Sequence, residues 1–375
     1  MSIHQPGQIT GIAMSGGVDS TATALILKEK YGTENLRGFF MRLAQPDFEQ
    51  QLERVQQVAE RVGVELRVID LSAAFEENVV SYFANSYFSG RTPNPCVICN
   101  LKIKFGLFLD AMIAAGVDTI ATGHYARLLH GTPCRLLMGV DQRKDQSYFL
   151  ARLRQQQLGR VIFPLGEMAK SDIYDFVEAH GFTDFRGKES QDICFLENIS
   201  VSTFLEDRRD TAPSGVIIDT EGNELGRHAG VHRYTIGQRR GLGIASSAPL
   251  YVIALDMEKN EVIVGRDRDL LCSEIKLAEI QWFSGEVPVE GEYLAKIRYT
   301  HRGAPARLTL NGNNCGRLLF SEPQRAVTPG QFAVLYNGEE VIGSGVIQQG
   351  TSNNHSAIVT VKNLSSDKAR NKTSR

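Results

Sequence analysis

What this sequence lacks excludes several classes of protein. No stretch reaches the roughly 18 consecutive apolar residues that a membrane-spanning helix needs. The first residues have neither the basic nor the apolar region of a secretory signal, so we expect a cytoplasmic protein with no membrane partner. Six cysteines in 375 residues are too few for a disulfide scaffold.

Neither sign of charge dominates, because the sequence contains 41 Lys and Arg and 43 Asp and Glu, which gives a net charge of −2. This balance argues against binding nucleic acid through bulk charge. Local segments differ from the total: residues 78–109 contain no Asp or Glu, and residues 291–330 hold six Lys and Arg against two Glu. Arg233, Arg239 and Arg240 add a further basic group. Such segments can still supply selective phosphate contacts.

The first 200 residues alternate between strand-like and helix-like patterns. Short apolar runs predict strands, and apolar spacing typical of one helix face predicts helices at Phe48–Val62 and Ile103–Ala115. The predicted strands are Ile9–Met14, Leu36–Met41, Leu66–Leu71 and Thr119–Thr122. This alternation predicts an α/β fold with an open, doubly wound parallel sheet. Ligands bind such sheets at the carboxyl ends of the strands, where Ser15, Met41 and Gly123 would lie.

After residue 200 the pattern changes to short β-rich runs separated by Gly and Asn. These runs predict a small β-rich linker domain over residues 201–278 and a β-barrel over residues 279–363. Residues 364–375 are polar and aperiodic, which predicts a disordered tail. The predicted strands are Gly215–Ile218, Tyr251–Asp256, Glu261–Val264, Tyr293–Tyr299, Arg307–Leu310, Phe332–Tyr336 and Val341–Ile347.

The segment Ser15-Gly-Gly-Val-Asp-Ser20 follows the first predicted strand and opens a helix. Glycines allow the backbone to approach an anion, and the helix N-terminus presents free N–H groups to it. Asp19 can hold Mg²⁺ beside the phosphates. The Gly-Lys-[Ser/Thr] ending of a Walker loop is missing, which favours a grip on pyrophosphate and cleavage of ATP between its α and β phosphates. The segment resembles the signature of PP-loop ATP pyrophosphatases, and the alternative is an ordinary strand–helix turn.

A second informative segment is Arg91-Thr-Pro-Asn-Pro-Cys96-Val-Ile-Cys99, followed by Lys102 and Lys104. Prolines favour an extended loop and then a helix start, which places Cys99 near a helix N-terminus. That position and the two lysines favour a thiolate, so Cys99 is a candidate nucleophile. Cys194 is a further candidate thiol. A zinc half-site and a transient disulfide are alternatives, whereas Cys134, Cys272 and Cys315 are expected to be ordinary buried thiols.

Together these motifs resemble the tRNA-specific 2-thiouridylase family, and the resemblance covers the chain except its tail. It implies a PP-loop (adenine nucleotide alpha hydrolase-like) domain over residues 1–200, the linker domain and a tRNA-binding barrel. Beyond the ATP loop, Cys99 and Cys194, it rests on Thr122-Gly-His-Tyr-Ala-Arg127, Lys144-Asp-Gln-Ser-Tyr-Phe-Leu150, Phe163-Pro-Leu-Gly166, Thr235-Ile-Gly-Gln-Arg-Arg-Gly-Leu-Gly243 and Thr328-Pro-Gly-Gln-Phe-Ala333.

The resemblance also implies a reaction. ATP would adenylate O2 of the wobble uridine of tRNAs for Lys, Glu and Gln. A sulfur-relay protein or cysteine desulfurase would deliver a persulfide to Cys194, and Cys99 would assist sulfur release through a transient Cys99–Cys194 disulfide. A persulfide is a strong nucleophile, and the base must leave the anticodon stack to reach it. ATP and Mg²⁺ are the implied cofactors, and the implied enzyme is a monomer.

The resemblance assigns three groups of residues by their positions in the motifs. Without it, Lys144 and Asp145 would be interpreted as a solvated charge pair and His124 as a satisfied strand-end histidine. The ATP contacts are Ala13, Met14, Ser15, Gly16, Gly17, Val18, Asp19, Ser20, Met41 and Gly123. The target base would meet Asn94, Pro95 and Cys96. The tRNA contacts are His124, Lys144, Asp145, Gln146, Arg298, Tyr299 and Gln331.

Cys96 departs from the family pattern, because many members carry Asp there. Three thiols, Cys96, Cys99 and Cys194, give an alternative hypothesis in which they hold a [4Fe–4S] cluster whose open iron binds sulfide. Two other functions compete with thiolation. One is a PP-loop ligase or amidotransferase that acts on a small molecule and needs no reactive cysteine. The other is a non-catalytic RNA-binding scaffold, which would need no ATP turnover.

Overall fold

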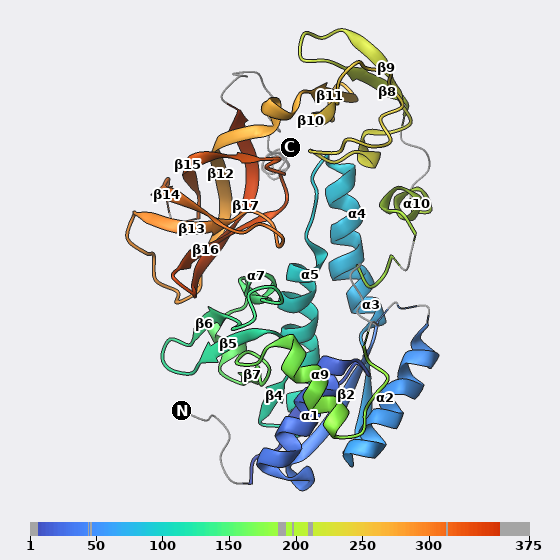
Figure 1. The fold of residues 1–375 in the computed structure, drawn as a ribbon, viewed down its shortest axis with the longest axis vertical. Coiled ribbons are helices and arrows are strands. Elements are labelled where there is room, and N and C mark those ends of the chain that lie inside the picture. The colour runs from blue at the N-terminus through green and yellow to red at the C-terminus, as the bar shows by residue number, and fades with distance from the viewer. Residues whose placement is uncertain are drawn as a thin grey trace, which may run out of the picture.

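The computed structural model describes residues 7–43, 45, 47–186, 193–196, 199–208, 213–312 and 314–352. The predicted tail lies outside these residues. Figure 1 shows an N-terminal α/β layer, a barrel and a small third unit at the far end of the long helix α4 (Ser81–Phe88). No helix in the described part of the chain has the length and apolar character required to cross a membrane.

The N-terminal half is built on a five-stranded sheet with strand order β3-β2-β1-β4-β7. All neighbouring strands pair in parallel, which confirms the predicted doubly wound sheet. The four predicted strands begin within one residue of their predicted N-terminal limits, whereas β7 was not predicted. The strands are β1 (Thr10–Ala13), β2 (Leu36–Arg42), β3 (Leu66–Asp70), β4 (Thr119–Ala121) and β7 (Val161–Ile162).

Helices cover both faces of this sheet. On one face pack α1 (Val18–Tyr31), α2 (Phe48–Val62) and α9 (Lys170–Ala179), whose buried side chains share one core with β1 and β2. The bounds of α2 match the prediction, because its buried valines recur at helical spacing and Gly63 ends it with a left-handed backbone at φ +88°. On the other face lie α5 (Pro95–Ile98), the π-helical segment η3 (Cys99–Phe108) and α6 (Leu109–Ala114).

The helix predicted at 103–115 therefore starts earlier, at Pro95, and widens into a π-helical stretch. Asn94 explains the early start, because its side chain accepts the Val97 N–H at 3.2 Å and caps the first turn. The remaining helical elements are short. They are η1 (Thr33–Asn35), α3 (Ser72–Phe75), η2 (Glu76–Val80), α7 (Ser147–Leu150), α8 (Gln155–Leu158), α10 (Val201–Glu206), η4 (Val231–Arg233) and η5 (Asp267–Leu270).

The predicted linker domain is a four-stranded sheet with order β10-β11-β8-β9. It packs on the N-terminal half through Phe88, whose ring lies 5.6 Å from that of His232, and the Arg233–Glu206 ion pair at 2.6 Å fastens α10 to it. A cavity of about 420 Å³ lies in its loop between Arg239 and Leu250. The strands are β8 (Gly215–Ile218), β9 (Glu224–His228), β10 (Tyr251–Asp256) and β11 (Glu261–Gly265).

Six antiparallel strands form the C-terminal barrel, which the pairing of β12 with β17 closes. Alternating buried and exposed residues, as along the first half of β15, fill the interior with aliphatic side chains. The predicted boundary at residue 278 falls inside β12, a strand that the sequence analysis missed together with β15. The strands are β12 (Leu271–Trp282), β13 (Glu292–Lys296), β14 (Ala304–Leu310), β15 (Gly316–Arg325), β16 (Phe332–Asn337) and β17 (Glu340–Ser352).

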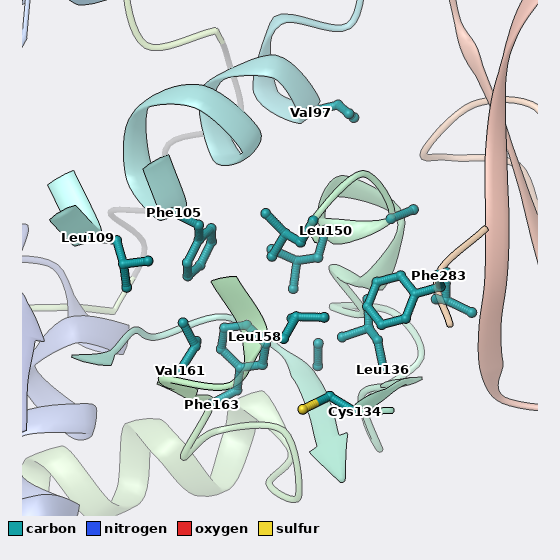
Figure 2. Close-up of a cluster of buried hydrophobic side chains, with 14 of the residues drawn as sticks. Val97, Phe105, Leu109, Cys134, Leu136, Leu150, Leu158, Val161, Phe163 and Phe283 are labelled. Atoms are coloured by element: carbon teal, nitrogen blue, oxygen red, sulfur yellow. The ribbon is translucent and has the colours of Figure 1, made fainter. Parts of the chain in front are cut away.

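A hairpin from the N-terminal half joins the barrel sheet, which the sequence analysis did not anticipate. Strands β5 (Ala126–Leu129) and β6 (Arg135–Met138) continue the sheet beyond β17. Side chains from both halves share one core, shown in Figure 2, where Leu136 and Leu150 lie near Phe283. The barrel is therefore packed firmly on the N-terminal half and is not merely joined to it by a linker.

Candidate active site

The ATP loop lies where β1 ends and α1 begins, at the carboxyl edge of the sheet. The Met14 N–H donates to the Phe39 carbonyl at 2.8 Å, which continues the β1–β2 pairing into the loop. Gly16 has φ +73° and packs against Val55, and a Cβ at Gly17 would meet only the Ser15 hydroxyl within 4 Å. The loop therefore presents open backbone at a helix N-terminus, which fits the phosphates of ATP.

Side-chain hydroxyls hold this loop in shape. The Ser15 N–H donates to the Ser20 Oγ at 3.1 Å, and that hydroxyl donates to the Gly17 carbonyl at 3.0 Å. Gly123, just beyond β4, is so close to the loop that a Cβ there would lie 2.9 Å from the backbone carbon of Asp19. The structure thus brings Gly123 to the loop from a separate strand, as the motif positions predicted.

Lys170 is a functional candidate that the sequence analysis missed. It lies in the first turn of α9, its side chain is 10% exposed, and its ammonium contacts the Asp19 carboxylate at 2.7 Å. The Tyr125 hydroxyl donates to the same Asp19 oxygen. A lysine in a first helical turn opposes the helix dipole and so needs an anion nearby, which is the signal that could have found it. The predicted Mg²⁺ site at Asp19 therefore includes a neutralising cation.

The cysteine segment begins on the opposite face of the sheet. Pro95 is the first residue of α5, Cys96 follows it with an exposed side chain, and Cys99 is 8% exposed at the start of η3. Cys194 is exposed, while its neighbours Phe195 and Leu196 are buried in the cluster that also covers Cys99. The structure therefore places Cys194 next to the cluster that contains Cys99, and no disulfide joins the described cysteines.

Burial corrects the expectation of a thiolate at Cys99. It raises the pKa of Cys99 to about 12, and Lys104 offsets this only partly. Desolvation also raises the pKa of Cys96, although solvent reaches that side chain. The neighbouring Cys194 raises the pKa values of Cys96 and Cys99 further. The three thiols are thus within electrostatic reach of one another and Cys96 and Cys99 are protonated at neutral pH.

Other expectations about cysteines have mixed outcomes. Cys134 and Cys272 are buried as predicted, whereas Cys315 is exposed in the turn before β15, so that prediction was wrong. Within the described residues, no three His, Cys, Asp or Glu side chains are arranged to hold a metal ion. The geometry of this site therefore gives no support to a zinc half-site or a three-cysteine cluster.

His124 lies between the ATP loop and the cysteine segment. Its Nδ1 is 2.8 Å from the Thr122 hydroxyl, and its ring lies 5.5 Å from Phe105 and 5.8 Å from Phe163. Burial lowers its pKa well below the usual value, and the nearby Lys104 lowers it further. His124 is therefore neutral at physiological pH. Gln146, another predicted tRNA contact, accepts the Tyr125 N–H at 3.1 Å and so supports the loop that carries His124.

Asp145 is enclosed between the two halves of the molecule. Its carboxylate, 1% exposed, accepts the Gly139 N–H, the Ser147 N–H and the Ser147 hydroxyl, and it pairs with Lys296 of β13 at 3.3 Å. The interpretation of Asp145 as a solvated charge does not fit this environment. Asp145 joins the catalytic half to the barrel, and a side-chain contact to tRNA stays a prediction.

The remaining predicted tRNA contacts line the neighbouring surface. Tyr299 lies on Phe149 with ring centroids 4.3 Å apart, and Arg298 donates to the Arg325 carbonyl at 3.2 Å. Lys144 is half-buried. Gln331 donates from its side chain to the Thr92 and Pro93 carbonyls at 3.0 Å each, so it contacts the cysteine segment directly.

Comparisons with known proteins agree with this architecture. Three family models match in succession: the tRNA methyl transferase HUP domain over residues 9–198, the tRNA methyl transferase PRC-barrel domain over 202–266 and the aminomethyltransferase beta-barrel domain over 272–347. The tRNA-specific 2-thiouridylase MnmA of Desulfotalea psychrophila is 54% identical over 345 residues, covering 90% of this chain and 98% of the relative.

More distant relatives carry the same name. That of Geobacter metallireducens is 41% identical over 351 residues, covering 90% of this chain and 95% of its own. That of Desulforudis audaxviator is 41% identical over 345 residues, covering 90% and 97%. All three model descriptions mention methyl or aminomethyl transfer, but the relatives that match almost end to end are named thiouridylases. The chain therefore belongs to the tRNA-specific 2-thiouridylase family.

Proposed function

We propose that this chain uses ATP to replace O2 of the wobble uridine of tRNA by sulfur, with 2-thiouridine, AMP and pyrophosphate as products. The observation that carries the proposal is the continuity between the ATP loop and the thiols. Gly123 packs on Asp19, the adjacent His124 lies against Phe105, and Phe105 belongs to the same helical segment as Cys99. An adenylated base can therefore lie within reach of a cysteine.

The reaction needs two activations. AMP is first attached to the uridine O2 as pyrophosphate leaves, with Lys170 and the α1 N-terminus stabilising the phosphates. Asp19 would hold Mg²⁺, which would neutralise phosphate charge. The terminal sulfur of a Cys194 persulfide then attacks C2 and AMP departs. The Cys99 sulfur then attacks the Cys194 Sγ as its thiol proton passes to N3 of the base, which lost its own proton when O2 was adenylated. This breaks the S–S bond, leaves the sulfur on C2 and forms a Cys99–Cys194 disulfide that a thiol reductant reopens.

The proposal favours a protein persulfide donor over a [4Fe–4S] cluster. A persulfide donor needs only an accessible acceptor thiol and a second thiol beside it, whereas a cluster needs three cysteine ligands together. The exposed Cys194 is accessible to a donor protein such as a sulfur-relay protein or cysteine desulfurase. Thiolation by iron-free protein, supplied with a persulfide donor, tests this choice. Activity that requires added iron would support the cluster instead.

The decisive experiment is mass spectrometry of tRNA nucleosides from a strain that lacks this gene. We expect wobble 2-thiouridine to disappear and to return with the wild-type chain. Cys99→Ser and Cys194→Ser should not restore it, while Cys315→Ser serves as a matched control on an exposed thiol outside the site. Unchanged 2-thiouridine in the deletion strain would refute the proposal. Activity that survives both catalytic substitutions would favour a ligase acting on a small molecule, and absence of AMP formation with tRNA would favour a scaffold.

A further inference from the structure

The barrel contacts the cysteine segment through one turn, residues 326–331 between β15 and β16. The Thr92 N–H donates to the Pro329 carbonyl at 2.9 Å. Gly330 has φ +92°, and a Cβ there would lie 2.9 Å from the Arg91 Cβ and 3.0 Å from the Thr92 carbonyl oxygen. Backbone therefore meets backbone at this contact, and the position requires glycine both for its φ and for space.

Gln331 adds a side-chain connection to the same segment. Its Nε2 donates to the carbonyls of Thr92 and Pro93, at 3.0 Å each. Both partners are acceptors, so the amide must face them with its NH₂ group and both N–H donors are engaged. The turn itself is held by β17, since the Gly330 N–H donates to the Ile347 carbonyl at 2.9 Å and the Ile347 N–H donates to the Gln331 carbonyl at 2.8 Å.

The segment that Gln331 holds leads directly to the predicted base-binding residues. Thr92 and Pro93 precede Asn94, which caps α5, and Cys96 lies in the first turn of that helix. The barrel lies beside the chain that connects α4 to α5 (Figure 1). A displacement of the turn would therefore move the start of α5, because the two prolines leave this segment little freedom to absorb it.

We propose that Gln331 is a positioning residue for the base-binding segment. It fixes Asn94–Cys96 relative to the barrel through the carbonyls of Thr92 and Pro93, so that RNA held on the barrel meets a correctly placed pocket. The motif resemblance assigned Gln331 to tRNA contact, whereas here its N–H donors serve the protein. This inference rests on the proposed function, because it explains how RNA binding on one domain is aligned with chemistry on another.

Two variants disturb the connection in different ways. Gln331→Glu replaces the donor with a carboxylate that repels the two carbonyls. Gly330→Ala leaves the Gln331 side chain intact but inserts a methyl group against Arg91 and Thr92. Gly312→Ala is the matched control, because Gly312 has φ +95° in the same barrel and a Cβ there would meet nothing within 4 Å. The control therefore carries the same backbone strain without the contact.

The first readout needs no RNA. Hydrogen–deuterium exchange of the Thr92 amide, in full-length protein, reports whether the turn is docked, because that N–H is bound to Pro329. The second readout separates tRNA affinity from turnover. We expect the Thr92 amide to exchange faster in both variants. The kcat for thiolation should fall by about tenfold, which corresponds to the loss of about one hydrogen bond, while the tRNA dissociation constant stays within about twofold of the wild type.

A direct RNA contact would give the opposite pattern. If Gln331→Glu weakens tRNA binding while kcat and Thr92 exchange match the wild type, the positioning role is refuted. Equal effects of Gly330→Ala and Gly312→Ala would also refute it, since strain alone would then explain the loss. These outcomes require an active wild type, so an inactive wild type with tRNA, ATP and persulfide donor would instead mark the failure of the proposed function.

Discussion

The protonated state of Cys99 gives the sharpest prediction. Its pKa rises from the ordinary thiol value of 9.0 to about 12 through burial. At pH 8 about one molecule in 10,000 would carry the thiolate, against about one in ten for an unperturbed thiol. Because the thiolate is the reactive form, alkylation of Cys99 in the free enzyme should be about a thousandfold slower than for an ordinary cysteine, before its 8% exposure is considered.

The assay is iodoacetamide labelling followed by peptide mass spectrometry, which resolves each cysteine. The Cys99 rate should rise about tenfold per pH unit from pH 7 to 10 without a plateau. Lys104→Met should slow it further, because Lys104 lowers the Cys99 pKa. Lys102→Met is the matched control, since the exposed Lys102 ammonium donates to Asn78 at 3.3 Å. A plateau below pH 10, or faster labelling in Lys104→Met, would refute the reasoning.

Three further predictions concern groups that hold the site together. Lys170→Met should weaken ATP binding by about 2 kcal/mol, roughly thirtyfold by calorimetry. Lys28→Met, in the last turn of α1 and away from the loop, should leave it unchanged. Lys296→Met removes the cation that pairs with Asp145 and should lower the free energy of unfolding in urea by about 3 kcal/mol. Adding Asp145→Asn should restore most of this loss. Burial lowers the folded-state pKa of His124, so stability should fall as pH drops below about 6.5, and His124→Gln should flatten that loss in pH-dependent melts.

Local features of the site were predictable, because local sequence determines them. The glycines at 16 and 17 follow a strand and open a helix, and the structure places an open phosphate loop there. The bounds of α2 were predicted because its valines recur at helical spacing and Gly63 ends it. The prolines before Cys96 indicated an extended loop and a helix start, although the π-helical widening that follows has no simple pattern.

Features that depend on distant partners were not predictable. The hairpin at 126–138 joins the barrel at Glu340, where β17 begins before its pairing with β12, and no local pattern encodes that pairing. The prediction of a thiolate at Cys99 was wrong for the same reason. Lysines nearby in the sequence favoured a thiolate, but burial of Cys99 in the cluster that contains Phe75, Phe83 and Phe195 raises its pKa. Burial is a property of the packed molecule, and a single sequence does not reveal it.

The contacts between the two halves explain why a barrel is attached to an ATP-binding sheet. Domains joined by small polar surfaces move relative to each other, but here the halves share a core, a continuous sheet and the buried Asp145–Lys296 pair. The Tyr148 hydroxyl adds a bond to the Phe332 carbonyl at 2.9 Å, one residue from Gln331. The spacing between the barrel surface and Cys99 is therefore constant. If the barrel holds the RNA, as proposed, it can deliver only a base at that spacing. Geometry as well as contacts would then select the substrate, and near-neutral overall charge would be no obstacle to selective RNA binding.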